Sequence, residues 1–220
     1  MVRVEIEDLP EEARAWASEI APRRLKRMQE VLSGRLQSVV VVAEAVRRRH
    51  NVSAIMRSAE AFGVDDVHLI TNSFRPAPGA ARGTERWVQI RRHDTTSGCL
   101  ESLKEQGFRI FVCDLDEDAY APETVPVDAP VALVFGSELQ GVSRDARELA
   151  DGVVQVPMRG FAESLNVSVA AALTLRPVCA RRRALVGEGD LTVDAQRARL
   201  IEWIEREVRA KTHARERHGM

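Results

Sequence analysis

The feature of this chain that most restricts its fold is a series of short apolar runs that alternate with helical stretches. Continuous valine-rich runs such as 37–43 (QSVVVVA) and 131–135 (VALVF) are typical of strands buried on both faces, which occur in parallel sheets covered by helices. The pattern therefore predicts an α/β fold with a parallel sheet. The expected strands are residues 37–43, 67–71, 88–91, 109–114, 131–135 and 153–156.

The segments between and around these strands are predicted helices and one long surface loop, residues 72–86, which has no periodicity. The expected helices are 51–62, 96–106, 143–150 and 166–184, with two helical segments within 10–34 and a last helix over 194–211 that carries Leu200, Trp203, Ile204 and Val208 on one face. This order predicts three parts: an N-terminal helical extension (1–36), an α/β domain (37–184) and a C-terminal helical extension (185–220).

The composition argues against secretion and against a membrane span. The longest apolar stretch, residues 39–43, is far shorter than the roughly 20 residues that cross a bilayer. The N-terminus lacks the apolar core of a signal peptide. We therefore expect a cytoplasmic protein. Its Asn-Val-Ser sequences would then not be glycosylated. Its three scattered cysteines, Cys99, Cys113 and Cys179, would be reduced thiols without a bound metal.

Basic residues gather in short clusters, although the formal net charge of the chain is −1. Such clusters suggest a polyanionic partner such as RNA. The alternative, that they are ordinary solvated surface, stays open from charge alone. The clusters are Arg23-Arg24-x-Lys26-Arg27, Arg47-Arg48-Arg49, Arg91-Arg92-His93 and Arg181-Arg182-Arg183.

Glycine-bearing loops occur late in the chain and not after the first strand, so a dinucleotide-binding fingerprint is absent. Residues 136–143 (GSELQGVS) and 157–166 (PMRGFAESLN) each follow a predicted strand, and ligands of open α/β sheets bind at such carboxyl ends. The alternative is that Gly136 and Gly141 serve only as turn residues while Ser143 caps a helix. That alternative leaves Glu138 without a role.

The sequence Asn-Val-Ser occurs twice, at 51–53 and 166–168, each time at the head of a predicted helix rich in small residues. Both asparagines could simply be helix caps. Arg57, six residues after Asn51, interrupts a helix that otherwise looks buried. A buried arginine normally needs an anionic partner, which makes Arg57 a candidate site residue.

Three segments resemble, in order and spacing, the signature motifs of the SpoU (TrmH-type) 2′-O-ribose RNA methyltransferases. They are HNVSAIMRSAEAFGV (50–64), VFGSELQGVS (134–143) and VPMRGFAESLNVSVAAAL (156–173). The resemblance covers about residues 23–183. It implies a SPOUT α/β knot, in which the end of the domain threads a loop of the parallel sheet. It also implies a homodimer that uses S-adenosylmethionine and no metal.

The resemblance also implies roles for individual residues. The expected catalytic residues are Arg57, Asn51, Glu138, Ser164 and Asn166, and the expected cofactor-binding residues are Leu115, Gly136, Val156, Met158 and Leu165. In this family the motif 1 arginine, here Arg57, is assigned to take the proton of the ribose hydroxyl. Because arginine has a pKa above 12, we expect Arg57 instead to bind the adjacent phosphate and stabilise the developing alkoxide.

Basic helical extensions at both ends resemble those of the family members that methylate guanosine 18 in the D-loop of tRNA. We therefore expect a tRNA substrate. The alternatives are another tRNA position, an rRNA, or a catalytically inactive RNA-binding protein. Pro177 is expected to interrupt the C-terminal helix of the domain. The expected RNA contacts are Arg23, Arg24, Arg27, His50, Arg181, Arg182 and Arg183.

Overall fold

A computed structural model describes residues 3–70, 83, 86–137 and 139–217 of the chain. The chain divides into two compact units, which are described separately below. Unit 1 consists of Met1–Arg35 and Gly187–Met220, and unit 2 consists of Leu36–Val186. Most of the predicted loop 72–86 lies outside the described residues.

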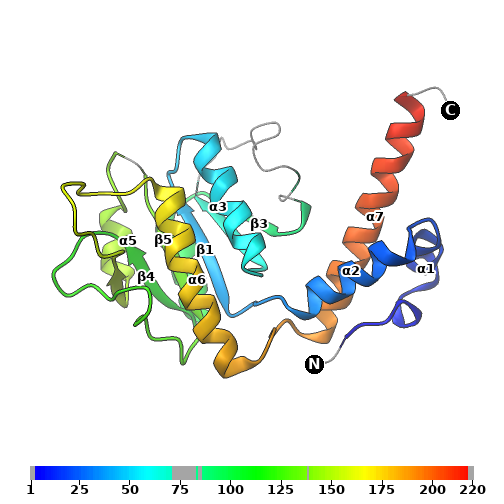
Figure 1. Ribbon diagram of the computed structural model, residues 1–220, viewed down its shortest axis with the longest axis horizontal. Coiled ribbons are helices and arrows are strands. Elements are labelled where there is room, and N and C mark those ends of the chain that lie inside the picture. The colour runs from blue at the N-terminus through cyan, green and yellow to red at the C-terminus, as the bar shows by residue number, and fades with distance from the viewer. Residues whose placement is uncertain (1–2, 71–82, 84–85, 138, 218–220) are drawn as a thin grey trace. The chain divides into compact units, whose positions relative to one another are not determined.

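Unit 2 is built on a 6-stranded sheet in the order β3-β2-β1-β5-β4-β6, with every pairing parallel (Figure 1). The predicted parallel sheet is confirmed, with strand ends that differ from the prediction by one or two residues. The valine-rich strands lie at its centre, where Val41 is the register partner of Leu133. The strands are β1 (Val39–Glu44), β2 (Asp66–Ile70), β3 (Gln89–His93), β4 (Arg109–Cys113), β5 (Val131–Phe135) and β6 (Gly152–Val154).

Helices cover both faces of this sheet. On one face, α3 (Arg49–Ala61) packs against α6 (Val167–Val186), as Figure 1 shows. The other face carries α4 (Thr96–Glu105) and α5 (Arg144–Leu149). Successive residues of β1 alternate between the two resulting cores: Val41 belongs to the α3–α6 core, whereas its neighbours in sequence belong to the α4–α5 core. This double burial explains why the strands read as unbroken apolar runs.

The helix α6 runs without a break from Val167 to Val186, with Pro177 inside it. The expectation that Pro177 interrupts this helix is therefore wrong. An internal proline removes one backbone hydrogen bond and costs about 3 kcal/mol. The buried side chains Thr174, Leu175 and Val178 surround it in sequence and anchor both turns in the core, which offsets that cost.

Unit 1 is helical and contains η1 (Ile6–Asp8), α1 (Glu11–Ser18), α2 (Pro22–Ser33) and α7 (Val193–Arg217). Both α1 and α2 contact α7. Of the face predicted for α7, Leu200, Trp203 and Ile204 are buried and Val208 is half-buried. The guanidinium carbon of the buried Arg35 lies 5.6 Å from the centre of the Trp203 ring, a cation–π contact. In the described part of the chain, no helix is long and apolar enough to cross a membrane.

Candidate functional site

A cavity of about 580 Å³ opens where β4, β5 and β6 end, and we call it the strand-end pocket. Its lining comes from residues 113–115, from within 135–141, 155–158 and 164–170, and from Arg48. All of these residues belong to unit 2. The position is the one at which open parallel sheets bind ligands, because the loops that leave neighbouring strands meet there.

The strand-end pocket gathers most of the site residues predicted from the sequence. The predicted cofactor-binding residues that line it are Leu115, Gly136, Val156, Met158 and Leu165. From the predicted catalytic set, Ser164 and Asn166 also line it. Three loops that are far apart in sequence therefore contribute to one cavity, whereas the roles of the individual residues stay predictions.

Gly136 and Gly141 close the loop that follows β5. A Cβ atom on Gly136 would lie 2.2 Å from backbone atoms of Gly141, so no larger residue fits at this position. Ser137 and Gly141 exchange two backbone hydrogen bonds of 2.9 and 3.0 Å. Gly141 has a φ of +66°, a conformation that glycine adopts without strain. The glycines are turn residues, as one alternative proposed, and the turn they form lines the strand-end pocket.

Glu44, at the end of β1, fixes the other end of this loop, and its role was missed in the sequence. Its carboxylate is 4% exposed and accepts hydrogen bonds from the Ser143 amide (2.8 Å), the Ser143 hydroxyl (2.6 Å) and the Thr96 hydroxyl (2.5 Å). Ser143 also caps α5, as predicted, by accepting a bond from the Ala146 amide. The available signal was a single acidic residue at the end of a valine run.

A second acidic residue, Asp114, follows β4 and lines the strand-end pocket. Its Oδ2 atom lies 2.6 Å from Nη2 of Arg147 on α5, and the same guanidinium donates to the Leu115 carbonyl at 3.3 Å. The Asp114 Oδ1 atom accepts a hydrogen bond from the Leu115 amide at 2.8 Å. This network fixes the backbone of Leu115 at the wall of the pocket.

The two Asn-Val-Ser sequences meet in space. The Asn166 amide nitrogen donates to the Asn51 side-chain oxygen at 3.2 Å, across 115 positions of sequence. Asn166 also bonds the Ser168 amide (2.9 Å) and hydroxyl (2.6 Å), so the capping interpretation holds for the second copy. It is wrong for the first copy, because α3 begins at Arg49 and Asn51 lies inside it, 7% exposed.

Arg57 lies on α3 and is half-buried, less enclosed than its sequence context predicted. It is not among the residues that line the strand-end pocket. Within the described part of the chain, its side chain makes no hydrogen bond or ion pair. Glu138, the other charged residue of the predicted catalytic set, lies outside the described residues.

The predicted RNA contacts of unit 1 lie on α2, where all three arginines are exposed. Arg24 pairs with Glu207 of α7 at 3.0 Å, and Arg27 pairs with Glu30 at 3.6 Å. In unit 2, His50 at the start of α3 is exposed.

The arginine run 181–183 differs from its prediction. Arg182 is 8% exposed and donates to the Ser38 hydroxyl (2.9 Å) and the Val127 carbonyl (2.8 Å), so the expectation that it contacts RNA is wrong. Arg181 and Arg183 are half-buried, and each donates to a backbone carbonyl, those of Val125 and Phe62 respectively. These guanidinium groups bond carbonyls of the connection between β4 and β5 and of the C-cap of α3, a structural role that a charge pattern does not reveal.

One cluster of possible metal ligands was missed because its members are far apart in sequence. Ligand atoms of His68 (β2), His93 (β3) and Cys99 (α4) all lie within 4.8 Å of one another. His68 Nδ1 is 2.9 Å from His93 Nε2 and 3.8 Å from Cys99 Sγ. The neighbouring parallel strands β2 and β3 bring the two imidazoles together.

Burial leaves the members of this cluster uncharged at neutral pH. Burial lowers the pKa of His68 to about 4 and also lowers the pKa of His93. Burial raises the pKa of the Cys99 thiol to about 12. At neutral pH the cluster therefore consists of two neutral imidazoles and a thiol, and a metal such as zinc would have to displace the thiol proton. The described cysteines are free thiols, as expected.

Comparison with known proteins identifies what this chain is similar to. A profile of the SpoU rRNA Methylase family matches residues 38–176, more than half of the chain. The chain is 40% identical over 154 residues to the tRNA (guanosine(18)-2′-O)-methyltransferase of Thermus thermophilus, a match that covers 69% of this chain and 79% of that protein. It is 35% identical over 185 residues to the protein of the same name from Escherichia coli, a match that covers 82% of this chain and 81% of that protein.

A solved structure extends this similarity to three dimensions. The crystal structure of the A. aeolicus TrmH/SpoU tRNA modifying enzyme superimposes with a TM-score of 0.77 at 34% sequence identity. The superposition covers 84% of this chain and 97% of that chain.

Proposed function

The chain belongs to the SpoU rRNA methylase family, and from this premise we propose that it methylates the 2′-oxygen of a ribose in tRNA, that of guanosine 18 in the D-loop. The proposed substrate rests on the similarity to two tRNA (guanosine(18)-2′-O)-methyltransferases, at 40% and 35% identity over most of each protein. The strand-end pocket supports the activity, because it contains the residues through which the resemblance places the methyl donor.

The strand-end pocket fits S-adenosylmethionine in size and in kind. Its volume of about 580 Å³ lies within the usual range for ligand pockets, roughly 300–1,000 Å³. The Gly136 turn presents bare backbone, and Leu115 and Leu139 offer apolar surface that is 52% and 92% exposed. Bound S-adenosylmethionine would supply an electrophilic methyl group on a positively charged sulfur. Leu115, Gly136, Val156, Met158 and Leu165 are the residues that would hold it.

The chemistry assigned to the chain's own residues is positioning and charge stabilisation. The ribose 2′-oxygen forms a bond to the methyl carbon while the carbon–sulfur bond breaks and the sulfur keeps the electron pair. Arg57 would bind the neighbouring phosphate and stabilise negative charge as it develops on the 2′-oxygen. A phosphate oxygen or a water molecule would accept the hydroxyl proton, because an arginine remains protonated.

The polar pair that joins the two Asn-Val-Ser sequences would hold the reacting ribose. A 3.2 Å hydrogen bond joins Asn51 to Asn166, and Asn166 and Ser164 both line the pocket. Glu138 is proposed to complete this set from the glycine loop, the name used here for residues 136–143. We propose no metal for the reaction, because His68, His93 and Cys99 are not among the residues that line the strand-end pocket.

Family membership also leads us to propose a homodimer, a knotted path for the end of the α/β domain, and a cytoplasmic location. Support for the homodimer comes from α6, where a row of two apolar side chains one turn apart stays exposed: Val169 (46%) and Leu173 (47%). Apolar residues in such a row usually pack against another surface.

The function is tested by incubating the protein with labelled S-adenosylmethionine and total RNA, then mapping the methylated nucleotide. Label at the 2′-oxygen of guanosine 18 in tRNA is the expected result. Label confined to rRNA or to another tRNA position would contradict the substrate. Absence of any label, with cofactor binding intact, would favour an inactive RNA-binding protein.

A further inference from the structure

We infer that Arg47, Arg48 and Arg49 form a phosphate-binding patch that holds the RNA backbone at the edge of the strand-end pocket. The inference rests on the proposed function, because it names the part of the protein that positions the RNA at the same site. We call these three residues the pocket-edge arginines.

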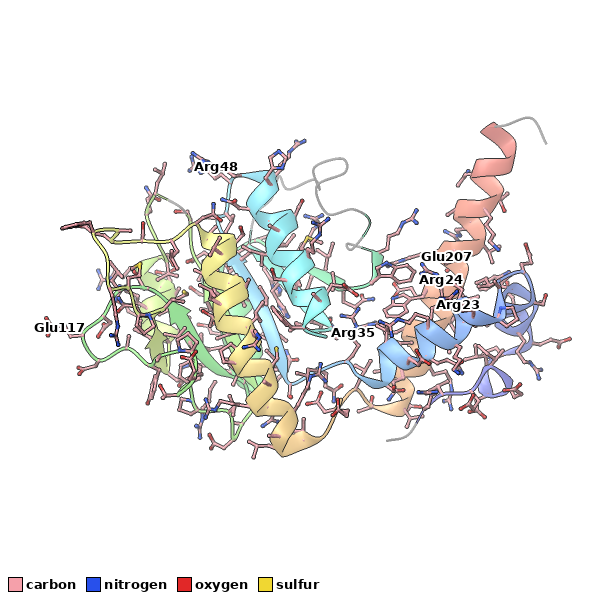
Figure 2. All side chains as sticks on the ribbon, in the orientation of Figure 1. Arg23, Arg24, Arg35, Arg48, Glu117 and Glu207 are labelled. Carbon is pink, nitrogen blue, oxygen red and sulfur yellow. The ribbon has the colours of Figure 1, made fainter. Side chains whose placement is uncertain are left out.

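The pocket-edge arginines are accessible and lie beside the pocket. Arg47 and Arg48 lie between β1 and α3 and Arg49 is the first residue of α3. All three side chains are exposed, as is the following residue, His50. Arg48 itself lines the strand-end pocket. Figure 2 shows Arg48 pointing outward from the loop that joins β1 to α3. A strand of RNA that brings its ribose to the edge of this pocket would therefore pass these side chains.

The charge of this patch is not neutralised within the described part of the chain, where the three side chains make no ion pair or hydrogen bond. Adjacent guanidinium groups repel one another, and a polyanion relieves that repulsion. Arginine also matches phosphate geometry, because its planar fork can donate two parallel hydrogen bonds. Four other arginines of unit 2 have acidic partners: Arg91 with Asp66, Arg109 with Asp128, Arg144 with Glu148 and Arg147 with Asp114.

Hydrogen bonds hold the backbone that leads into the patch. Glu44, directly before the loop, is buried and accepts three hydrogen bonds from Ser143 and Thr96. Ala45 then turns the chain with a φ of +51°, and among the described residues it is the one non-glycine residue with a positive φ. A fixed base reduces the entropy that the patch loses when it binds a phosphate.

The two runs of three arginines in unit 2 therefore have opposite roles, although they read alike in sequence. The run 181–183 donates to carbonyls and to Ser38 inside the unit, whereas the run 47–49 is exposed. Both runs contain three arginines, so the exposure of the side chains decides which run can contact RNA.

The experiment measures binding of an unmodified tRNA transcript as a function of salt, with S-adenosylhomocysteine present so that no methyl transfer occurs. The test variant is the double substitution Arg47→Gln with Arg49→Gln, which leaves the pocket-lining Arg48 in place. Each lost phosphate contact should flatten the slope of log affinity against log salt by about 0.7–0.9, so the double variant should lose roughly 1.4–1.8. The matched control is Arg109→Gln with Arg144→Gln, which removes two arginines that have acidic partners, one half-buried and one exposed.

A flattened slope in the test variant, with the control variant and S-adenosylhomocysteine affinity near wild type, is the expected result. Equal slopes for wild type and test variant would overturn the patch, as would a wild-type protein that does not bind tRNA. Circular dichroism and melting of both variants check that each one folds. The proposed function fails separately: it falls if wild-type protein binds tRNA but transfers no methyl group to guanosine 18.

Discussion

Arg57 is the single residue on which the proposed chemistry depends most. It is half-buried on α3 and, among the described residues, has no hydrogen-bonding partner that would give it a structural task. We predict that Arg57→Ala keeps the melting temperature and cofactor affinity near wild type, while methyl transfer falls by about 10² or more, because a positioned charge at the reacting oxygen is lost. Single-turnover transfer and thermal melting, measured on the same preparation, check both parts.

The conservative variant sharpens this prediction. Arg57→Lys should restore little activity, because an ammonium group cannot reproduce the forked geometry of a guanidinium. The competing explanation is a structural ion pair, for which Glu138 would be the partner. Under that explanation Arg57→Ala would melt much earlier, since the unpaired carboxylate would cost several kcal/mol if it is buried. Early melting, or tRNA methylation at a near wild-type rate, would contradict the assignment.

Glu44 offers a prediction about positioning at a distance from the reacting atoms. In Glu44→Gln an amide group replaces one carboxylate oxygen and faces the donors of Ser143 and Thr96. We expect a loss of about 1–3 kcal/mol in the free energy of unfolding and a weaker affinity for S-adenosylmethionine, because the glycine loop loses its anchor. Denaturant titration and calorimetric binding test this, with Glu148→Gln on the exposed face of α5 as a control that should change neither.

At the scale of the element, α6 carries arginines with different tasks. Arg182 is buried against Ser38 and Val127, whereas Arg176 on the same helix is exposed. We predict that Arg182→Ala lowers the free energy of unfolding by about 2–4 kcal/mol through lost hydrogen bonds and packing, and that Arg176→Ala changes it by less than about 0.5 kcal/mol. If Arg182→Ala and Arg176→Ala had equal free energies of unfolding in chemical denaturation, the buried hydrogen bonds of Arg182 would contribute nothing to stability.

The buried imidazole of His68 on β2 should make the stability of the protein depend on pH. Burial lowers the pKa of His68 from 6.5 to about 4, so protons bind the unfolded chain more readily than the folded protein in this range. The free energy of unfolding should therefore fall as the pH falls from about 6.5 towards 4, with His68 contributing a slope of at most about 1.4 kcal/mol per pH unit. Denaturant titrations between pH 7 and pH 5 should show a smaller loss in His68→Asn than in wild type. His50→Asn, which removes an exposed histidine, should keep the wild-type slope.

These elements also indicate how far sequence alone could lead. The apolar runs of the central strands β1 and β5 were easy to predict, because burial on two faces leaves a continuous apolar pattern. Contacts between residues that are far apart in sequence could not be predicted in this way. Nothing local distinguishes the arginine run 181–183, which bonds carbonyls, from the exposed run 47–49, and the spacing of His68, His93 and Cys99 hides their contact.

At the scale of the whole molecule, the motif resemblance succeeded where local patterns could not. It placed Leu115, Gly136 and Met158 around one cavity, although they follow three different strands, and it linked the two Asn-Val-Ser sequences, whose asparagines bond each other. It could not show that Arg57 would stand outside the pocket lining in the single chain. A site completed by a second subunit would explain that separation, because the partner could bring the RNA to Arg57.

The proposed homodimer can be tested through the exposed row on α6. Leu173 is 47% exposed and lies one turn from Val169, so a charge placed there would be buried without a partner in a dimer that uses this face. We predict that Leu173→Glu weakens dimerisation on the order of 100-fold, about 2.7 kcal/mol, and lowers methyl transfer in parallel if both subunits complete the site. Leu185→Glu is the matched control, because Leu185 is 61% exposed on the same helix but lies on a different side of it. Sedimentation equilibrium measures the assembly, and a Leu173→Glu protein that remains as dimeric as the Leu185→Glu control would place the interface elsewhere.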